Sequence, residues 1–509
     1  MELHQSIFEP FTGVGRNPLR PRSGLILSGA GQCVESAFAM TLALGNAHKP
    51  VLIALYEGLS VEGYQPNPSV MEAAHLFPGA ILQVGLQLPL FNPDGLWAIG
   101  RGEYDAQLER MALRYAALFC PVLLRIGYEF DGEEWNGYEP KAYIAAYRRI
   151  AMKLVCAPNV ALVWDSYTTD TENVMDWYPG DDVVDWFGYN TMSPKFDCGR
   201  MLALAREHGK PLLNGEASYA MDADHCPFSR WVEDYFQSMR MHHVQACQYI
   251  NWRWQVYPRN ANWHDWQDGR ITDDPEKVAV YQAAMAGPDL VVRGAGYAQP
   301  LRLVADCGRA IEEGTPSAPW KPEDDHLTCE KGYALWVEGA WTTYGSGWQC
   351  GWVGERMVLH ISTPEDFSGA LLVKPFGKEE MRFAIHGREV TWRAGNGFAR
   401  FHDLPSGDAV ISLSGTDGET VALELVALMA YAEGLPSVTG LCCRDGTLFW
   451  TVVHGASCYS VYADGALIGR TDTNHFPLPF PAARACVSVF DSRLGEGKPA
   501  HLRMEEYHE

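Results

Sequence analysis

The sequence between residues 121 and 129 reads Pro121-Val122-Leu123-Leu124-Arg125-Ile126-Gly127-Tyr128-Glu129. Its aliphatic residues predict a short buried strand, and the run closes on a carboxylate. A similar aliphatic run, followed by residues at helical spacing, recurs between about residues 24 and 285. The predicted strands are Gly24–Ser28, Val51–Tyr56, Ile81–Leu86, Val122–Glu129, Val160–Asp165, Val184–Tyr189, Pro211–Ala217 and Val244–Trp252. Eight such units over about 260 residues predict a (β/α)8 TIM barrel of the α/β class.

The pattern changes near Gly287-Pro288, where the helical spacing stops and short alternating strands with turns begin. We expect a β-sandwich to about residue 435, in which Trp336, Trp341, Trp348 and Trp352 fit either a carbohydrate-binding role or core packing. The last stretch, with strand-like runs such as 448–452, 459–465 and 485–491, resembles a small fibronectin type III β-sandwich. The expected domains are therefore residues 1–287, 288–435 and 436–509.

The charge balance argues against two classes of partner. Forty Lys and Arg residues against sixty-three Asp and Glu residues give a net charge of −23. Such a field repels phosphate backbones and anionic lipid surfaces, so we expect neither a nucleic acid nor a membrane as partner. No protein partner is predicted. The first residues lack a basic segment followed by an apolar one, which favours a cytoplasmic chain, and a secreted chain whose leader had been removed would read the same way.

Two of the predicted strands end in glutamates that could act together. Alternation along the fourth strand places Arg125, Gly127 and Glu129 on one face, and alternation along the seventh places Asn214 and Glu216 on one face. Strands four and seven lie across the mouth of a barrel, at the end where such folds carry their active sites. Two facing carboxyl groups, one protonated and one ionised, can cleave a glycosidic bond. The sequence therefore predicts a glycoside hydrolase site.

Arg125 interrupts an otherwise aliphatic strand. Burying its charge costs free energy unless a carboxylate lies beside it, which places Arg125 beneath an acidic site. A buried ion pair elsewhere in the barrel is the alternative.

The glutamates closing strands four and seven resemble the arrangement of glycoside hydrolase clan A, and within it glycoside hydrolase family 26, typified by β-mannanases. That family has an Arg three residues before a His-Glu pair, and here Arg125 stands three before Tyr128-Glu129. The segments Asp131-Gly132, Trp135-Asn136-Gly137 and Leu25–Gly29 also look like the family. The resemblance implies that Glu129 is the acid/base and Glu216 the nucleophile of a retaining endo-β-glycanase, acting on mannan, glucan or xylan. Tyr128 departs from the family's His.

The resemblance also implies contacts around the two glutamates. A strand-six Tyr would hydrogen-bond the nucleophile, for which Tyr189 is the candidate, and strand eight would supply an aromatic platform from Trp252 or Trp254. Asp165, which follows Trp164 at a strand end, is expected to bind a sugar hydroxyl. The expected substrate-binding residues are Arg125, Tyr128, Trp135, Trp164, Asp165, Tyr189, Asn214, Trp252 and Trp254.

Other chemistries have weaker support in the sequence. The run Asp222-Ala223-Asp224-His225-Cys226 lacks the spacing of calcium or zinc sites, and Gly29-Ala30-Gly31 lacks the third glycine of a dinucleotide fingerprint. We therefore expect no cofactor and no metal. The remaining acidic candidates are Glu57, Asp131, Glu133 and Glu134. Two alternatives stay open: a barrel that only binds glycans, and a barrel hydrolase that uses a metal.

Overall fold

A computed structural model gives the structure of the chain and describes residues 2–14, 16–167, 173–193, 199–252, 254, 266–307, 327–338, 341–346, 349–377, 379–416 and 418–504. The chain forms two compact units. The first comprises residues 1–70 and 79–296, and the second comprises residues 71–78 and 297–509. The predicted division into three domains stays a prediction.

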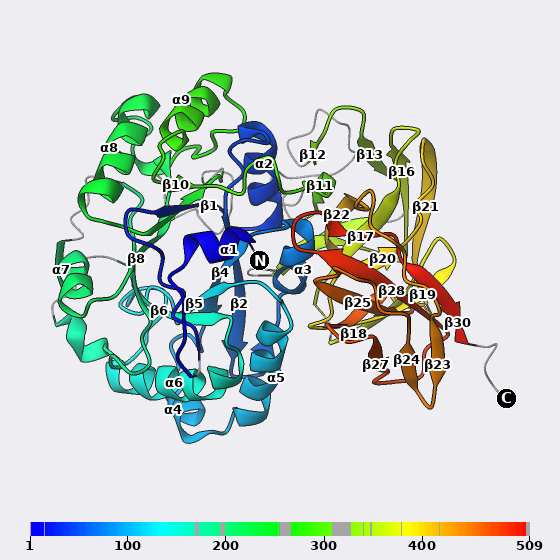
Figure 1. Ribbon diagram of the computed structural model, residues 1–509, viewed down its shortest axis with the longest axis horizontal. Helices are drawn as coiled ribbons and strands as arrows, with labels where there is room; N and C mark the ends of the chain where they lie inside the picture. The colour runs from blue at the N-terminus through cyan, green and yellow to red at the C-terminus, as the bar shows by residue number, and fades with distance from the viewer. Residues whose placement is uncertain are drawn as a thin grey trace. The chain divides into compact units, whose positions relative to one another are not determined.

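Eight parallel strands form a closed barrel in the first unit (Figure 1). Each strand pairs with the next, and β9 and β2 both pair with β1, which closes the ring. The predicted TIM barrel is thus confirmed. The barrel strands are β1 (Ile26–Gly31), β2 (Leu52–Ser60), β4 (Ile81–Gln87), β5 (Val122–Ile126), β6 (Val160–Ser166), β7 (Trp186–Asn190), β8 (Leu212–Ala217) and β9 (Ala246–Ile250). Short strands β3 (Gly63–Gln65) and β10 (Leu290–Val291) flank β2 and β1.

Helices cover the outside of this barrel, so most strands are buried along their whole length. Several helices begin with a proline behind a capping side chain: Asn92 caps α4, Glu139 caps α6 and Asp274 caps α9. The helices are α1 (Glu2–Ile7), α2 (Val34–Leu44), α3 (Pro68–Leu76), α4 (Pro93–Arg101), α5 (Asp105–Ala116), α6 (Pro140–Lys153), α7 (Gly199–Glu207), α8 (Phe228–Met241) and α9 (Pro275–Met285), with 3-10 turns at Leu154–Cys156, Val174–Trp177 and Tyr219–Met221.

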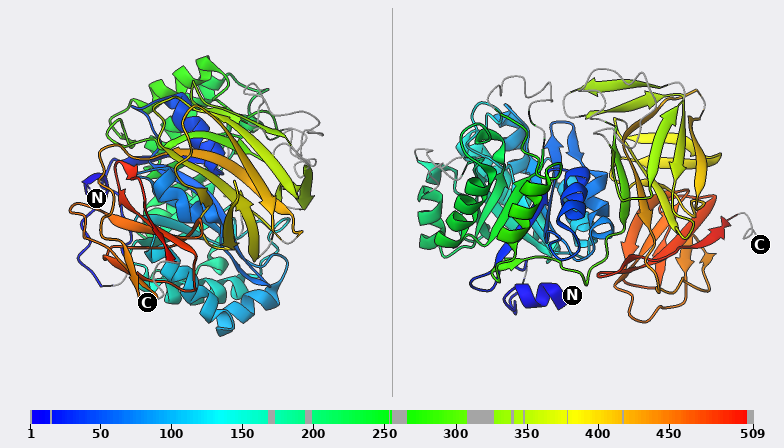
Figure 2. Two further views of the ribbon diagram at one scale, coloured as in Figure 1. Left: turned by 90° about the vertical axis from the view of Figure 1, so that its right-hand side faces the viewer. Right: turned by 90° about the horizontal axis from the view of Figure 1, so that it is seen from above.

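The N-terminal segment closes one end of the barrel. Ile7, Phe8 and Leu19 belong to one buried apolar cluster with residues at the beginnings of the strands, such as Leu52 and Ile81. The Nε1 group of Trp186 donates to the Pro18 carbonyl oxygen at 2.9 Å. Figure 2 shows α1 lying across this end of the strands. The strands' carboxyl ends, where the titratable side chains lie, therefore form the other end.

The second unit is built from antiparallel strands and confirms the predicted β-sandwich architecture. It contains two apolar clusters, one of residues 303–428 and one of residues 438–489 with neighbours to 504. The resemblance of the last part to fibronectin type III is not confirmed. The strands are β11 (Leu301–Asp306), β12 (Leu327–Cys329), β13 (Ala334–Glu338), β14 (Trp341–Ser346), β15 (Gln349–Gly354), β16 (Arg356–Ser362), β17 (Gly369–Pro375), β18 (Glu380–Ile385), β19 (Arg388–Arg393), β20 (Ala399–Phe401), β21 (Asp408–Gly415), β22 (Val421–Ala430), β23 (Cys442–Arg444), β24 (Thr447–Phe449), β25 (Cys458–Ala463), β26 (Ala466–Thr471), β27 (His475–Pro477), β28 (Arg484–Asp491), β29 (Gly495–Glu496) and β30 (Ala500–Arg503).

The tryptophans of this unit have different environments. Trp352 is fully buried in the core, whereas Trp336 is partly exposed and its ring stacks on that of His360 at 3.4 Å. Trp348 and the side chain of Trp341 lie outside the described residues. A carbohydrate-binding role for this unit stays a prediction.

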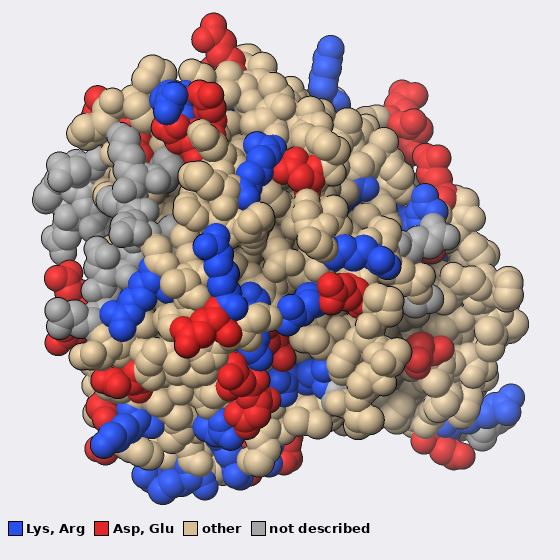
Figure 3. Space-filling view, turned by 60° about the vertical axis from the view of Figure 1, so that its left-hand side comes forward, with Lys and Arg blue, Asp and Glu red and all other residues tan. Residues whose placement is uncertain are grey.

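The surface carries charges of both signs. On the face in Figure 3, acidic and basic side chains are interspersed rather than gathered by sign. Within the described residues no helix has both the length and the apolar character to cross a membrane.

Candidate active site

Glu129 lies in a turn just beyond its strand. β5 ends at Ile126, and both Gly127 and Glu129 have φ near +54°, in the left-handed region. The prediction of a strand continuing to Glu129 is therefore wrong, because the backbone turns at Gly127, where the lack of a Cβ permits that conformation. The side-chain amide of Asn136 donates to the carbonyl oxygens of Tyr128 and Glu129 and braces the turn.

Glu216 reaches the barrel interior because of an irregularity in β8. The β7–β8 pairing passes from Tyr189–Asn214 directly to Asn190–Glu216, so Gly215 is an extra residue. A one-residue bulge reverses the side-chain alternation beyond it. Asn214 and Glu216 consequently do not share a face, contrary to prediction: Asn214 Oδ1 accepts from Tyr235 of α8 at 2.8 Å. Asn214 therefore lies on the helix side of the strand, away from the predicted substrate site.

Arg125 is the centre of a buried ion-pair network. Its Nη2 group lies 2.6 Å and its Nε group 3.0 Å from Asp165 Oδ2, and its Nη1 group donates to Glu216 Oε1 at 2.9 Å. Burial alone would lower the pKa of Arg125, but the charges of Asp165 and Glu216 raise it well above its ordinary value. The structure thus places Arg125 beneath an acidic site, as one of the two interpretations had it. Its side chain is fully buried and orients carboxylates, so the expectation that Arg125 binds substrate is wrong.

Asn190 connects this network to Glu129. Its Oδ1 accepts from Arg125 Nη2 at 3.1 Å, and its Nδ2 donates to Glu129 Oε1 at 2.8 Å. A guanidinium has only donors, so Arg125 fixes which end of the Asn190 amide points at Glu129. Sequence reasoning missed Asn190 because the strand register was one residue out: Asn190 faces the site, and its neighbour Tyr189 does not.

Glu129 accepts hydrogen bonds on both of its carboxyl oxygens. Trp135 Nε1 donates to Oε2 at 3.0 Å, opposite the bond from Asn190 to Oε1. Burial, and then the negative charge of Glu216, raise the pKa of Glu129 to about 8, although the Asn190 bond and Arg125 act in the opposite direction. Because indole and amide N–H groups can only donate, neither neighbour accepts the Glu129 proton. The raised pKa keeps a proton on Glu129 at neutral pH.

Tyr56 supplies a second donor to Glu216. Its hydroxyl lies 2.8 Å from Glu216 Oε1, the oxygen that Arg125 also holds. The Tyr56 ring meets that of Tyr128 edge-on at 5.2 Å, and the Arg125 guanidinium lies over the Tyr128 ring at 5.1 Å. Tyr128 therefore lies beside Tyr56 and Arg125, and its contact with substrate stays a prediction. Tyr56 was not predicted, and its only sequence signal is that it closes the second predicted strand.

Three glycines make room for these side chains. A Cβ at Gly215 would come within 3.0 Å of the Arg125 guanidinium carbon and closer still to Asn190 Oδ1. A Cβ at Gly188 would lie 2.4 Å from Asp165 Oδ1, and one at Gly85 would lie 2.5 Å from the Tyr56 ring. The strands thus pair a large polar residue with a neighbour that has no side chain.

Two further predicted contacts lie on the outside of the barrel wall. The Trp164 ring is fully buried and stacks on Phe130 at 4.8 Å, and it packs edge-on against Phe187. The Tyr189 hydroxyl lies 4.0 Å from Met239 Sδ of α8. Strand alternation turns both residues toward the helices, so the predictions of substrate contact for Trp164 and of a bond from Tyr189 to the nucleophile are wrong.

Asp165 is inside the barrel but is not exposed to a ligand. Its side chain is fully buried against Arg125, so the predicted contact with a sugar hydroxyl is wrong. Burial raises the pKa of Asp165 to about 6 despite the opposing charge of Arg125. Its role is to hold the guanidinium in place.

Aromatic side chains flank the two glutamates. Trp135 packs edge-on against Tyr167 at 4.3 Å beside Glu129, and Tyr167 is 38% exposed. Trp252 and Trp254 both lie beyond the end of β9, in a cluster with Met192, Ala220 and Trp266. Trp254 Nε1 donates to Ser218 Oγ at 3.2 Å, two residues past Glu216 in the chain. Contact of Trp135, Trp252 and Trp254 with a sugar stays a prediction.

The other acidic candidates serve local structure. Glu57 accepts hydrogen bonds from Tyr64 and Tyr115, and burial raises its pKa. Asp131 accepts from Ser166 Oγ at 2.6 Å, whereas Glu133 and Glu134 are exposed. Among the residues that the structure describes, no three His, Cys, Asp or Glu side chains are grouped so as to hold a metal ion.

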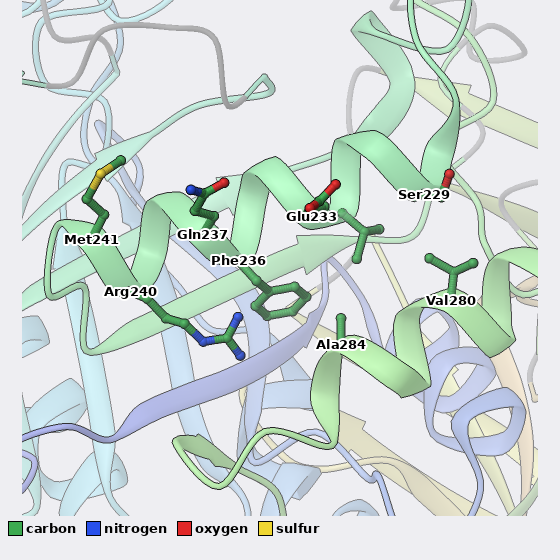
Figure 4. A pocket seen from close by; sticks show the side chains of 9 residues that line it. Ser229, Glu233, Phe236, Gln237, Arg240, Met241, Val280 and Ala284 are labelled. Atoms are coloured by element: carbon green, nitrogen blue, oxygen red, sulfur yellow. The ribbon is translucent and has the colours of Figure 1, made fainter.

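A surface hollow between α8 and α9 is distinct from this site. Figure 4 shows Phe236, Arg240 and Glu233 of α8 facing Val280 and Ala284 of α9 across it. These helices belong to the outer layer, and neither glutamate of the barrel lines the hollow.

Comparison with known proteins places the chain among glycoside hydrolases. A β-1,3-xylanase of an Alcaligenes species is 27% identical over 337 residues, which are 57% of this chain and 69% of that protein. The β-1,3-xylanase TXYA of a Vibrio species is 28% identical over 319 residues, 54% of this chain and 67% of that protein. No model of a protein family matches the chain.

Solved structures with a similar barrel include mannanases. A Bacillus subtilis mannanase has a TM-score of 0.37 at 16% identity, covering 45% of this chain and 81% of that one. The glycoside hydrolase family 26 β-mannanase BoMan26A of Bacteroides ovatus has a TM-score of 0.38 at 14% identity, covering 53% and 91%. The named sequence relatives are xylanases rather than mannanases.

Proposed function

We propose that this chain, a glycoside hydrolase, cleaves a β-linked polysaccharide with retention of configuration, with Glu129 as acid/base and Glu216 as nucleophile. The observation that carries the proposal is the contrast between the two carboxyl groups. In the part of the chain that the structure describes, the hydrogen-bond partners of the Glu129 carboxyl group are the N–H donors of Trp135 and Asn190, and burial and the charge of Glu216 raise its pKa to about 8. Glu216 Oε1 instead accepts from a guanidinium and a phenol. One protonated carboxyl group and one carboxylate, carried by strands that lie across the barrel mouth from each other, are what glycoside cleavage requires.

In the first step, Glu216 attacks the anomeric carbon and the bond from that carbon to the leaving oxygen breaks. The proton of Glu129 passes to the leaving oxygen, so the departing sugar leaves as a neutral alcohol. The negative charge of Glu216, which helps to keep Glu129 protonated, disappears as the ester forms.

In the second step, Glu129 is ionised and takes a proton from water as the water attacks the anomeric carbon. The ester bond to Glu216 breaks and its electron pair returns to the carboxylate. Esterification of Glu216 removes a charge that raises the Glu129 pKa, so the same residue is a better base in this step than its resting state would suggest.

For the substrate, β-1,3-xylan is the first choice, because both named sequence relatives are β-1,3-xylanases. Mannan and β-glucan remain in the proposal as other β-linked chains. Tyr128 precedes the acid/base and stands where family 26 has His. Substitution of Tyr128 can therefore probe the choice of substrate.

The test compares the parent chain with Glu129→Ala and Glu216→Ala on β-1,3-xylan, β-1,4-xylan, mannan, β-1,3-glucan and mixed-linkage glucan. The proposal requires the parent to cleave at least one, with both variants reduced by about 10²-fold or more. Azide added with an activated aryl glycoside should give the α-glycosyl azide with Glu216→Ala and the β-glycosyl azide with Glu129→Ala. A parent that binds glycans and cleaves none would favour the binding-protein alternative. Activity lost to EDTA and restored by a divalent ion would favour the metal alternative.

A further inference from the structure

We infer that Tyr56 is a positioning residue for the nucleophile, and that with Arg125 it selects Glu216 Oε2 as the oxygen that attacks the sugar. The inference rests on the proposed function, and its experiment is arranged so that the two can fail separately. It assigns to a strand-two tyrosine the task that the sequence resemblance assigned to Tyr189.

The geometry around the Glu216 carboxylate is asymmetric. In the part of the chain that the structure describes, the bonds from Tyr56 at 2.8 Å and from Arg125 Nη1 at 2.9 Å both fall on Oε1. An oxygen that accepts two strong donors has its lone pairs engaged, and its nucleophilicity falls accordingly. Oε2 is therefore the atom left to form the bond to the anomeric carbon.

The Tyr56 ring is held in this position from several sides. Its edge lies against Tyr128, the absence of a side chain at Gly85 leaves space for it, and its own carbonyl oxygen accepts from Asn67 Nδ2 at 2.8 Å. Burial, and then the charge of Glu216, raise the pKa of Tyr56 well above its ordinary value. The phenol therefore stays protonated and remains a donor at neutral pH.

β7, the strand that corresponds to strand six of the barrel, cannot provide this donor. Tyr189 faces Met239 of α8, and the residue that faces inward is Asn190, whose N–H group is already directed at Glu129. Because Asn190 rather than Tyr189 faces inward, β7 places no tyrosine beside Glu216. Tyr56 instead approaches the Glu216 carboxylate from β2.

The two donors on Oε1 matter most when the ester breaks. After Oε2 has bonded to the sugar, Oε1 is a neutral carbonyl oxygen. As water attacks and the bond between Oε2 and the anomeric carbon breaks, the electron pair spreads over the re-formed carboxylate, and Tyr56 and Arg125 stabilise the charge that returns to Oε1. Loss of the Tyr56 hydroxyl should therefore slow the breakdown of the glycosyl-enzyme.

The experiment measures pre-steady-state kinetics of the full chain on a dinitrophenyl β-glycoside of the sugar that the parent cleaves. Tyr56→Phe is compared with Tyr189→Phe, which removes the same atom from a ring that faces α8. We expect Tyr56→Phe to lower kcat by about 10- to 100-fold, to enlarge the burst of dinitrophenol because the second step becomes slower, and to move the acidic limb of kcat/KM to higher pH. Tyr189→Phe should stay within about two-fold of the parent in kcat.

Three results would overturn the inference: an unchanged kcat and burst in Tyr56→Phe, equal losses in the two variants, or a lower kcat with unchanged burst and pH profile. A melting temperature within a few degrees of the parent shows that Tyr56→Phe is folded. If Tyr56→Phe is not folded, the burst is measured instead on the more conservative variant with 3-fluorotyrosine at position 56, and that burst decides. Activity that survives in Glu216→Ala would instead refute the proposed function and leave Tyr56 without a nucleophile to position.

Discussion

The side chain of Asn190 lies between Arg125 and Glu129, accepting from the guanidinium at 3.1 Å and donating to the carboxyl group at 2.8 Å. Since Arg125 also holds Glu216, one buried cation orients Glu216 directly and Glu129 through the Asn190 amide. The strands that carry Arg125, Asp165, Asn190 and Glu216 are consecutive in the barrel wall, so this chain of contacts is short.

Removal of the Asn190 amide should alter the titration of Glu129. The Asn190 bond lowers the pKa of Glu129, so Asn190→Ala should raise that pKa and move the basic limb of the kcat/KM profile to higher pH. We expect kcat to fall about 10-fold as the carboxyl group loses its orientation. Tyr189→Phe, one residue earlier on the outer face, is the matched control, and a basic limb that moves to lower pH would contradict the assignment.

The parent itself should lose activity in alkali. Because the acid must be protonated and the pKa of Glu129 is raised to about 8, kcat/KM should decline as the pH rises through about 8. A pH series on the cleaved substrate measures this, and Glu129→Ala assayed on an activated aryl glycoside, which needs no acid for its first step, should lose that limb. A parent profile that is flat to pH 9 would contradict the role of Glu129.

Glu129 should also reduce stability at high pH. Its pKa is raised above the ordinary value of 4.5, so its contribution to stability is present below pH 4.5 and is lost as the pH rises through about 8. Glu129→Gln should therefore raise the melting temperature more at pH 9 than at pH 4. Glu133→Gln, at an exposed position in the same loop, should show no such difference between the two pH values.

Arg125 should matter for folding as much as for activity. Arg125→Met leaves Asp165 and Glu216 without their cation in the barrel interior, and breaking such a pair costs about 3–5 kcal/mol. Chemical denaturation of the variant should show a loss of that order. Arg101→Ala removes an exposed arginine paired with Glu103 and should change the free energy of unfolding by less than about 1 kcal/mol. Equal losses in the two variants would contradict the account.

The space left by Gly85 should be needed for activity. A Cβ there would press on the Tyr56 ring, so Gly85→Ala should reduce kcat by displacing the donor to Glu216 although it changes no polar group. Gly58 lies two residues after Tyr56 in β2, and a Cβ there would meet its nearest atom, Gln65 Oε1, at 3.8 Å. Gly58→Ala should therefore retain activity. Equal kcat in Gly85→Ala and the parent would show that the position of Tyr56 is unimportant.

The sequence predicted the barrel because eight short apolar runs alternate with residues at helical spacing. It also singled out Glu129 and Glu216, which close such runs, and Arg125, which interrupts one. Which way a side chain faces was harder to predict. Alternation assigned Asn214 and Glu216 to one face, and the bulge at Gly215 separates them.

Contacts formed across the barrel were also beyond the reach of the sequence. Tyr56 and Glu216 are 160 positions apart, and only the closed ring of strands brings the phenol to the carboxylate. Whether Tyr189 or Asn190 faces the barrel interior depends on a one-residue shift in the expected register of β7. Asp165 was expected at a strand end in contact with a sugar hydroxyl, whereas the structure shows it fully buried because Arg125 offsets its charge.

The most direct measurement is the identification of the residue that becomes glycosylated. A 2-deoxy-2-fluoro glycoside with a good leaving group slows both steps and traps the intermediate, and mass spectrometry of the digested protein then locates the label. The account predicts one sugar on the peptide containing Glu216, and a larger trapped fraction in Tyr56→Phe. A label on another residue, or cleavage of natural substrate with inversion and no label, would contradict it.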